Sequence, residues 1–253
     1  MSKERDKETL GILVRSVDYG GADRVVTFLT PGNPGLALFA RGARKSTRRF
    51  SGGLEPFRIT TIRYRPKAQD GLGRLIKTTI DEEFEQVTQD LCRLYWASIG
   101  LEWAVSVGPD PETSHVFYLT REYLRWINTE EREQWYIEAG SLRYALILLF
   151  GAGLLPTLTQ CFRSGRPLHQ IEHPHFSTTG GGILDAAHVQ PQDYATPVHK
   201  KTALFLESLA QSRFPEHREP EILREAREIV LQLYRSLVDH TPRSLELLRS
   251  VWI

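Results

Sequence analysis

Two stretches decide the fold of the N-terminal part of the chain: residues 57–65 read FRITTIRYR and residues 72–80 read LGRLIKTTI. In both, apolar and β-branched residues alternate with polar ones, which is the period-two pattern of a β-strand. Shorter runs of the same kind precede them at 9–17, 24–30 and 36–40, separated by Gly- and Pro-containing turns. The sequence therefore predicts five consecutive strands.

Five short strands without an intervening helix favour a small closed barrel, because closure removes exposed strand edges. The five-stranded OB-fold is a common architecture of this kind that binds nucleic acid. We predict an α+β fold in which an OB-fold barrel, residues 1–80, precedes an all-α helical bundle, residues 81–253. An irregular insert at 156–196 interrupts the bundle.

The period of the sequence changes after the fifth predicted strand. Asp81, Glu82 and Glu83 have the composition of an N-cap and an acidic first helical turn. Residues 156–196 are rich in Pro, Gly, Thr and His and follow neither period, which suggests a lid, a binding loop or a metal-stapled segment. Apolar residues at helical spacing predict helices from Leu91 onwards and at 114–128, 130–151, 197–213, 220–239 and 242–251.

The net charge of +1 hides an asymmetry along the chain. Residues 1–80 hold 16 Lys and Arg against seven Asp and Glu, whereas the remainder holds 16 against 24. Such a difference between two halves indicates a polyanion-binding module joined to a part with another task. The basic residues concentrate between residues 41 and 77, where the only acids are Glu55 and Asp70.

Residues 41–50 read RGARKSTRRF, a run of five cations with hydroxyl groups among them. Arginine presents a fork of donors that suits phosphate, and Ser and Thr hydroxyls supplement it. The alternative is a solvated basic loop over core aromatics, and core packing is the favoured role of Phe39, Phe57 and Tyr64 taken singly. We predict that nucleic acid is bound by Arg41, Arg44, Lys45, Arg48, Arg49, Arg63, Arg65, Lys67, Arg74 and Lys77, with Phe50 available to stack on bases.

The second candidate is a metal site in the irregular insert. Cys161 and Ser164, then Asp185 and His188, have the paired spacing of a zinc ribbon, and three further His residues lie between the pairs. A structural zinc site needs four N or S ligands, and here only one thiolate is present. A metal-free loop is the favoured interpretation. A catalytic zinc would also need a general base, and Glu172 lies nearby in sequence.

Motifs of common enzymes are absent from the sequence. It contains no G-x-S-x-G, no G-x-x-x-x-G-K-[ST] and no H-E-x-x-H. We therefore expect a protein that is not an enzyme. In the helical part, apolar grooves rimmed by Arg121, Arg125, Lys200 and Lys201 are candidates for holding an acidic partner peptide, with an ordinary solvated rim as the alternative.

Several motifs follow one another in an order that is specific. They are Gly11-Ile12-Leu13-Val14-Arg15, Tyr19-Gly20, Asp23-Arg24-Val25-Val26-Thr27, Ala40-Arg41-Gly42-Ala43-Arg44-Lys45-Ser46 and Gly53-Leu54-Glu55-Pro56-Phe57. Looser matches follow at Leu154-Leu155-Pro156, Gly165-Arg166-Pro167-Leu168, Gly181-Gly182-Ile183-Leu184 and Pro242-Arg243-Ser244-Leu245. This pattern resembles the RecO family of bacterial recombination mediators, and the resemblance spans nearly the whole chain.

The resemblance implies an OB-fold, a helical bundle and a zinc-ribbon-like insert. It also implies binding of single- and double-stranded DNA and annealing of complementary strands. With RecR, a family member helps RecA load onto DNA coated by single-strand-binding protein. Family members with zinc carry four cysteines, whereas the four positions here are Cys161, Ser164, Asp185 and His188. We therefore expect no zinc or other cofactor, and an insert held by residues such as Phe162, Leu168 and Ile183.

No apolar run reaches the roughly 18–20 residues of a transmembrane helix, and the N-terminal MSKERDKETL lacks the apolar region of a signal peptide. Two cysteines are too few for a disulfide framework. We expect a cytoplasmic, nucleoid-associated protein without membrane contact. The leading hypothesis is a DNA-binding and annealing protein of recombinational repair. The alternatives are a zinc-dependent enzyme that uses residues 156–196, and an OB scaffold that binds RNA or protein.

Overall fold

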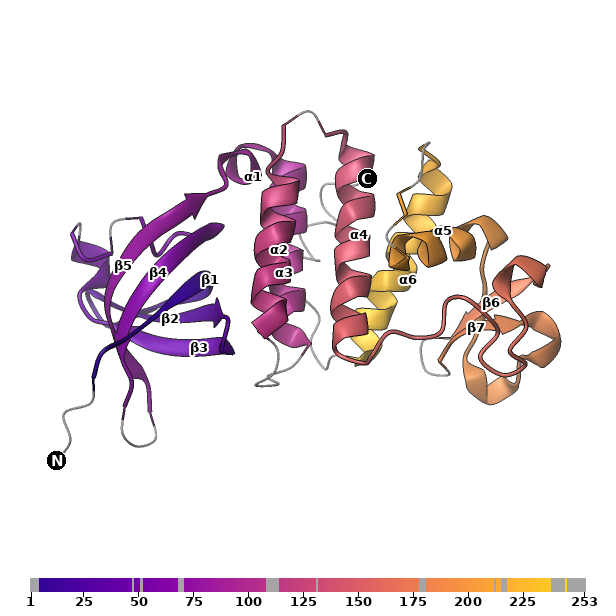
Figure 1. Cartoon of the computed structure of the whole chain (residues 1–253), viewed down its shortest axis with the longest axis horizontal. Coiled ribbons are helices and arrows are strands. Elements are labelled where there is room, and N and C mark those ends of the chain that lie inside the picture. Colours follow the sequence, from indigo (N-terminus) through magenta and orange to yellow (C-terminus); the bar gives the residue numbers. More distant parts are fainter. Residues whose placement is uncertain are drawn as a thin grey trace. The chain divides into compact units, whose positions relative to one another are not determined.

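The computed structural model describes residues 5–46, 48–50, 52–67, 71–107, 114–130, 132–177, 181–211, 213–214, 218–237 and 244. The chain divides into two compact units, Met1–Glu130 and Glu131–Ile253. Among the described residues, the first contains a barrel and three α-helices, and the second contains three α-helices and a small sheet (Figure 1). The domain boundary expected at residue 80 stays a prediction.

Five strands of the first unit form a closed barrel: β1 Lys7–Tyr19, β2 Asp23–Thr30, β3 Asn33–Ala40, β4 Arg58–Arg65 and β5 Gly73–Glu83. Around the barrel the order is β1-β2-β3-β5-β4, and β4 pairs with β1 to close it. Only β3 and β5 run parallel, joined at Leu38–Gly73 and Phe39–Arg74. This is the OB-like architecture that the alternating runs predict, and the α+β fold class is confirmed.

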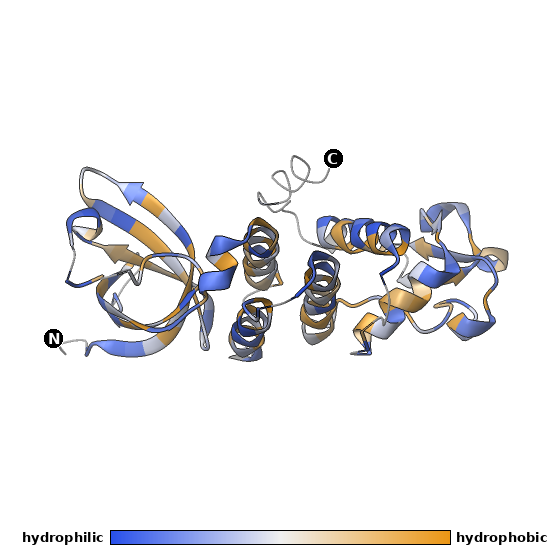
Figure 2. Ribbon diagram, turned by 90° about the horizontal axis from the view of Figure 1, so that it is seen from above, coloured by the Kyte–Doolittle hydropathy of each residue, from blue (hydrophilic) through white to orange (hydrophobic). Residues whose placement is uncertain are grey.

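The inward side chains of the strands form the barrel core. Val26, Phe28, Leu38, Ile62 and Leu75 are fully buried in one cluster. Hydrophobic and hydrophilic residues alternate along the barrel strands (Figure 2), as period-two geometry requires when one face is buried. The barrel therefore presents its polar side chains outward.

The expected helix start at residues 81–83 is wrong. Asp81, Glu82 and Glu83 belong to β5, whose pairing with β4 extends to Arg58 opposite Glu83. The acidic side chains bind neighbouring elements and do not cap a helix. Thr61 of β4, for example, donates a hydrogen bond to Asp81 Oδ2 at 2.9 Å. The first helix, α1 Glu85–Gln89, begins two residues beyond the strand.

Two longer helices complete the first unit, α2 Leu91–Ser106 and α3 Ser114–Ile127. The Asp90 side chain caps α2 by accepting a hydrogen bond from the Arg93 backbone N–H at 2.9 Å. Arg93 donates to the Ile127 carbonyl at 2.5 Å, which satisfies an acceptor at the end of α3.

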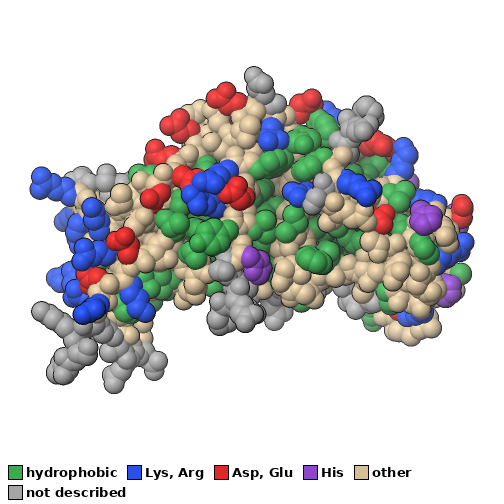
Figure 3. Space-filling view, viewed as in Figure 1, with side chains coloured by type: hydrophobic (Ala, Val, Ile, Leu, Met, Phe, Trp, Pro, Cys, Tyr) green, Lys and Arg blue, Asp and Glu red, His purple; other side chains and the backbone are tan. Residues whose placement is uncertain are grey.

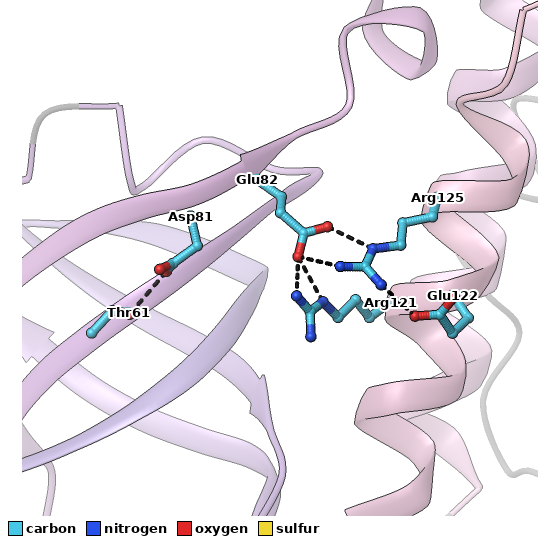
Figure 4. A network of polar contacts seen from close by, with 6 residues as sticks. All are labelled: Thr61, Asp81, Glu82, Arg121, Glu122 and Arg125. Carbon is cyan, nitrogen blue, oxygen red and sulfur yellow. Dashed lines mark hydrogen bonds and ion pairs between the residues drawn. The ribbon is translucent and has the colours of Figure 1, made fainter.

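Glu82 connects the barrel to α3 (Figure 4). Its carboxylate accepts hydrogen bonds from Arg121 and from Arg125 Nε, the latter at 2.7 Å, and Arg125 also reaches Glu122. Burial alone would raise the pKa of Glu82, but the two guanidinium groups outweigh it and hold the pKa below its usual value. This network fixes the end of β5 against a helix of the same unit.

The second unit contains α4 Gln134–Gly151, α5 Lys200–Ala210 and α6 Pro220–Leu237. These helices lie within the ranges expected at 130–151, 197–213 and 220–239, and α3 lies within 114–128. The helix expected at 242–251 falls, apart from residue 244, outside the described residues. Among the helices of the described part, none is long and apolar enough to cross a membrane.

The insert is more ordered than its sequence indicates. Three short strands, β6 Pro174–Ser177, β7 Gly182–Asp185 and β8 Thr196–Pro197, pair in the order β7-β6-β8. Strands of two to four residues are too short to show a period, so the expectation of a stretch without regular structure is corrected. A short 3-10 turn at Leu168–Gln170 precedes β6, and two more, at Ala186–His188 and Pro191–Asp193, lie between β7 and β8.

Candidate nucleic-acid interface

The outer face of β4 and β5 carries four exposed cations that stand opposite one another. Arg63 pairs in register with Lys77, and Arg65 pairs with Arg74. Like charges directly opposite each other in a sheet destabilise the strand pair. We call these four residues the cation ladder. Lys and Arg side chains gather over the barrel end of the face drawn in Figure 3.

Asp6, just before β1, partly neutralises this ladder. Arg63 Nη2 donates to Asp6 Oδ2 at 3.0 Å, and Arg65 donates to Oδ1 through Nε at 2.9 Å and Nη2 at 2.8 Å. The hydrogen bond from Arg65 is the largest of the effects that hold the pKa of Asp6 below its usual value. Within the described part of the chain, Arg74 and Lys77 have no such carboxylate partner.

The basic loop, residues 41–51, is fastened to the barrel by an apolar anchor. Phe50 is 4% exposed and belongs to the barrel core together with Leu54. At the other end of the loop, the Gly42 backbone N–H donates to Asp23 Oδ1 at 2.6 Å. The loop is therefore held at both ends.

The loop also joins β5 directly. The Thr78 backbone N–H donates to the Arg49 carbonyl at 2.9 Å. Gly53, in the turn that follows, approaches β5 so closely that a Cβ would lie 2.3 Å from Thr78 Oγ1. Since Thr78 follows Lys77 in the strand, the basic loop is hydrogen-bonded to β5 one residue beyond the cation ladder. We call the basic loop and the cation ladder together the basic surface.

The five cations of the loop differ in their availability. Arg41, Lys45 and Arg48 are exposed and have no carboxylate partner among the described residues. Arg44 lies 3.7 Å from Asp18. Arg49 donates to the Arg41 carbonyl at 2.7 Å and lies over the Phe50 ring, 4.9 Å from its centroid, so it supports the loop more than it faces solvent.

A hollow of about 440 Å³ lies beside the loop. Arg24, Arg44 and Ser46 contribute donors to its lining, Phe50 and Leu54 contribute apolar surface, and Glu55 contributes a carboxylate. The arginines and the serine are the groups that commonly contact a phosphate.

The expected stacking role of Phe50 is wrong for this conformation, because its ring is buried in the barrel core. Phe57 is likewise buried, at 5% exposure. Phe50 acts as a positioning residue for the adjacent cations.

Sequence reasoning missed the most exposed aromatic residue of the barrel. Tyr19, at the end of β1, is 61% exposed. Its ring meets Phe39 edge-on, with centroids 5.7 Å apart and an interplanar angle of 84°. Phe39 is half-buried and pairs in register with Arg74 of the ladder. Two aromatic rings therefore border the basic surface, where unpaired bases have a place to stack.

The four expected metal positions do not fit a zinc ion. Arg166 Nη1 donates to Asp185 Oδ2 at 2.9 Å, so a guanidinium already neutralises that carboxylate. The Ser164 backbone N–H donates to Cys161 Sγ at 3.4 Å, and serine is a poor zinc ligand. In the described part of the chain, no group of three His, Cys, Asp or Glu residues is arranged to hold a metal. His188 is exposed.

Packing and hydrogen bonds hold the insert. Leu168 and Ile183 are buried, as expected, whereas Phe162 is half-buried. Burial alone would raise the pKa of the Cys161 thiol, but hydrogen bonds from Ser164 and nearby backbone groups outweigh it and lower the pKa. The zinc-enzyme alternative therefore lacks a metal cluster within the described residues.

All four cations proposed to rim a peptide groove have hydrogen-bond partners within the chain, and one of them, Lys201, lines an apolar hollow. Arg121 and Arg125 bind Glu82 within the first unit. In the second unit, Lys200 donates to the His169 carbonyl and Lys201 to Glu219. The last pair borders a hollow of about 270 Å³ lined by Trp135, Leu204, Phe205 and Leu223.

Comparisons with known proteins match nearly the whole chain. Residues 1–84 match the family model described as the N terminal of recombination protein O, and residues 88–246 match its C terminal. The DNA repair protein RecO of Anaeromyxobacter sp. (strain K) is 35% identical over 178 residues, covering 70% of this chain and 68% of that protein. RecO of an Exiguobacterium species is 26% identical over 235 residues, covering 92% and 90%. RecO of Myxococcus xanthus is 33% identical over 174 residues, covering 68% of each.

Proposed function

The chain belongs to the recombination protein O family, which gives it a role in recombinational DNA repair, and we propose that it binds DNA through the basic surface of its barrel. The observation that carries this proposal is the pair of like-charge contacts in the cation ladder. Arg74 and Lys77 face other cations without a carboxylate partner among the described residues. A polyanion would relieve their repulsion, whereas folding alone gains nothing from it.

The same surface supports strand annealing. Cations that neutralise phosphates reduce the repulsion between two approaching strands. Tyr19 and Phe39 offer rings on which unpaired bases can stack, which is worth about 1–3 kcal/mol per base and tolerates any sequence. In this proposal, the barrel holds a single strand with its bases separated, and the partner strand pairs with it. No catalytic step is needed.

The partners in this proposal follow from family membership. Single- and double-stranded DNA are the ligands of the barrel. RecR and single-strand-binding protein are the protein partners, and RecA is assisted indirectly when it loads onto coated DNA. Work on chromosomal DNA would place the protein at the nucleoid.

The test is a salt titration of binding by fluorescence anisotropy, with single-stranded DNA, duplex DNA and RNA of equal length. We expect DNA binding whose logarithmic affinity falls linearly with the logarithm of salt concentration. Tyr19→Ala should weaken binding of single strands more than of duplex, because only unpaired bases reach the ring. Tyr19→Phe, which keeps the ring, is the control.

Three outcomes would contradict the proposal in whole or in part. A wild-type protein that does not bind DNA at low salt would remove the function itself. A clear preference for RNA would favour the RNA-binding scaffold instead. Equal losses for single strands and duplex in Tyr19→Ala would remove the stacking role while leaving the phosphate contacts intact.

A further inference from the structure

Asp6 occupies the place that a phosphate group would take on the cation ladder. Its two carboxylate oxygens accept three hydrogen bonds from Arg63 and Arg65, at 2.8–3.0 Å. Forked arginine donors bind carboxylate and phosphate with the same geometry. The Asp6 side chain is 18% exposed, while both arginines remain more than half exposed. The two guanidinium groups therefore stay accessible to a ligand from outside.

We propose that Asp6 is an internal competitor for DNA, which holds Arg63 and Arg65 until a backbone phosphate displaces it. This inference rests on the proposed function and adds to it a residue that sets affinity. The exchange conserves the hydrogen bonds of the arginines: each N–H that leaves the carboxylate finds a phosphate oxygen. One cost remains. The displaced Asp6 carboxylate is exposed to water near the DNA, and the negative charges of the DNA repel it.

The position of Asp6 in the chain suits this exchange. It precedes β1, whose first paired residue is Lys7, opposite Tyr64. Displacement therefore requires movement of a residue outside the strand and no loss of barrel pairing. By contrast, Glu82, which binds Arg121 and Arg125, is a paired strand residue, so its backbone cannot move away without disturbing the sheet.

Protonation is not the route by which Asp6 would release the arginines. The hydrogen bond from Arg65, then that from Arg63, lowers the pKa of the carboxyl group. The carboxylate thus stays ionised near neutral pH, and the local concentration of phosphate decides the exchange. Binding should favour DNA segments that present several adjacent phosphates, because they compete with a tethered carboxylate.

The experiment compares the DNA affinity of the full chain with that of Asp6→Asn. We expect the variant to bind single-stranded DNA between about threefold and tenfold more tightly at low salt, as removal of two exposed ion pairs allows. Glu8→Gln is the matched control. It removes the same charge from an exposed residue that lies opposite Arg63 in the sheet, so a general field effect would appear in both variants.

A double-mutant cycle ties the gain to the two arginines. In an Arg63→Ala/Arg65→Ala background, Asp6→Asn should change affinity no more than Glu8→Gln does. If Asp6→Asn lowers affinity, Asp6 orients the arginines for DNA and the competitor role is wrong. Equal gains in Asp6→Asn and Glu8→Gln, or a gain that persists without the arginines, would also overturn it. Absence of DNA binding in the wild type would instead remove the proposed function.

Discussion

The barrel and the insert both contain arginines that bind carboxylates, but among the described residues of these two regions only the barrel also has exposed cations without a carboxylate partner. In the insert, Arg163 binds Asp193 at 2.7 Å and Arg166 binds Asp185 at 2.9 Å. On the barrel, Arg74 and Lys77 face other cations across the sheet. A cation that binds a carboxylate stabilises the local structure. A cation that lies opposite another cation and has no carboxylate partner destabilises the sheet, so its presence indicates a negatively charged ligand.

This contrast separates stability from binding. Substitutions in the insert should affect unfolding and leave DNA affinity unchanged. Substitutions in the cation ladder should affect DNA affinity and leave unfolding nearly unchanged. Phe50 is the exception: it is a core residue that also positions the basic loop, so its substitution should affect both stability and DNA affinity.

Phe50→Ala should have the largest effect. Loss of a buried ring costs about 3–5 kcal/mol of unfolding free energy, and Phe50 is 4% exposed. The loop would lose its anchor, so DNA affinity should fall as well. Urea unfolding followed by circular dichroism measures the first effect and anisotropy the second.

Phe50→Leu is the control for the anchor. It keeps apolar contact with the core and should retain most of the affinity. A Phe50→Ala protein with unchanged stability would show that the ring is not part of the core.

Glu138 offers a pH test within the second unit. Burial raises the pKa of Glu138 to about 7, although Arg227 donates to it at 2.9 Å. Between the ordinary pKa of a glutamic acid and about 7, the Glu138 side chain therefore keeps its proton in the folded state and loses it in the unfolded chain. Unfolding free energy should fall by on the order of 2–3 kcal/mol as pH rises from about 4.5 to about 7.

Glu138→Gln, which cannot titrate, should remove this pH dependence. The measurement is chemical unfolding of both proteins at a series of pH values, with a tryptophan signal. Parallel curves for wild type and variant across this range would show that Glu138 does not carry a raised pKa.

The Arg163–Asp193 pair should give a smaller effect that is confined to stability. Arg163 donates to both carboxylate oxygens of Asp193, a side chain that is 5% exposed. Arg163→Ala leaves this carboxylate without its cation and should lower the Tm. Anisotropy should detect no change in DNA affinity. If Arg163→Ala changes the DNA affinity and leaves the Tm unchanged, the proposed difference between the insert and the barrel is wrong.

Much of the barrel could be predicted because its signals are local. Alternation in residues 57–65 and 72–80 predicts two of the strands, and the charges of residues 41–50 are visible in the sequence. The buried position of Phe50 depends on barrel closure, which brings together residues distant in sequence. The acidic end of β5 has the same composition as a helix start, so only its pairing with β4 distinguishes the two.

The remaining features depend on contacts between distant residues. Asp6 meets Arg65 across 59 residues of sequence, and the ring of Tyr19 at the end of β1 meets Phe39 of β3. The strands of the insert are too short for a period to appear. These contacts are tertiary, so the local sequence pattern of one element does not predict them.

In the proposed function, the cation ladder is kept for a ligand at a cost to the stability of the fold. The most direct test measures the DNA affinity and the unfolding free energy of Arg74→Ala/Lys77→Ala. The control, Arg224→Ala/Arg235→Ala, removes two exposed cations from α6. We predict that the ladder variant binds DNA more weakly, with a salt slope flatter by about two. Its stability should be unchanged or higher by a few tenths of a kcal/mol, since repulsion is relieved. A ladder variant that loses stability and keeps the wild-type affinity and salt slope would contradict the account.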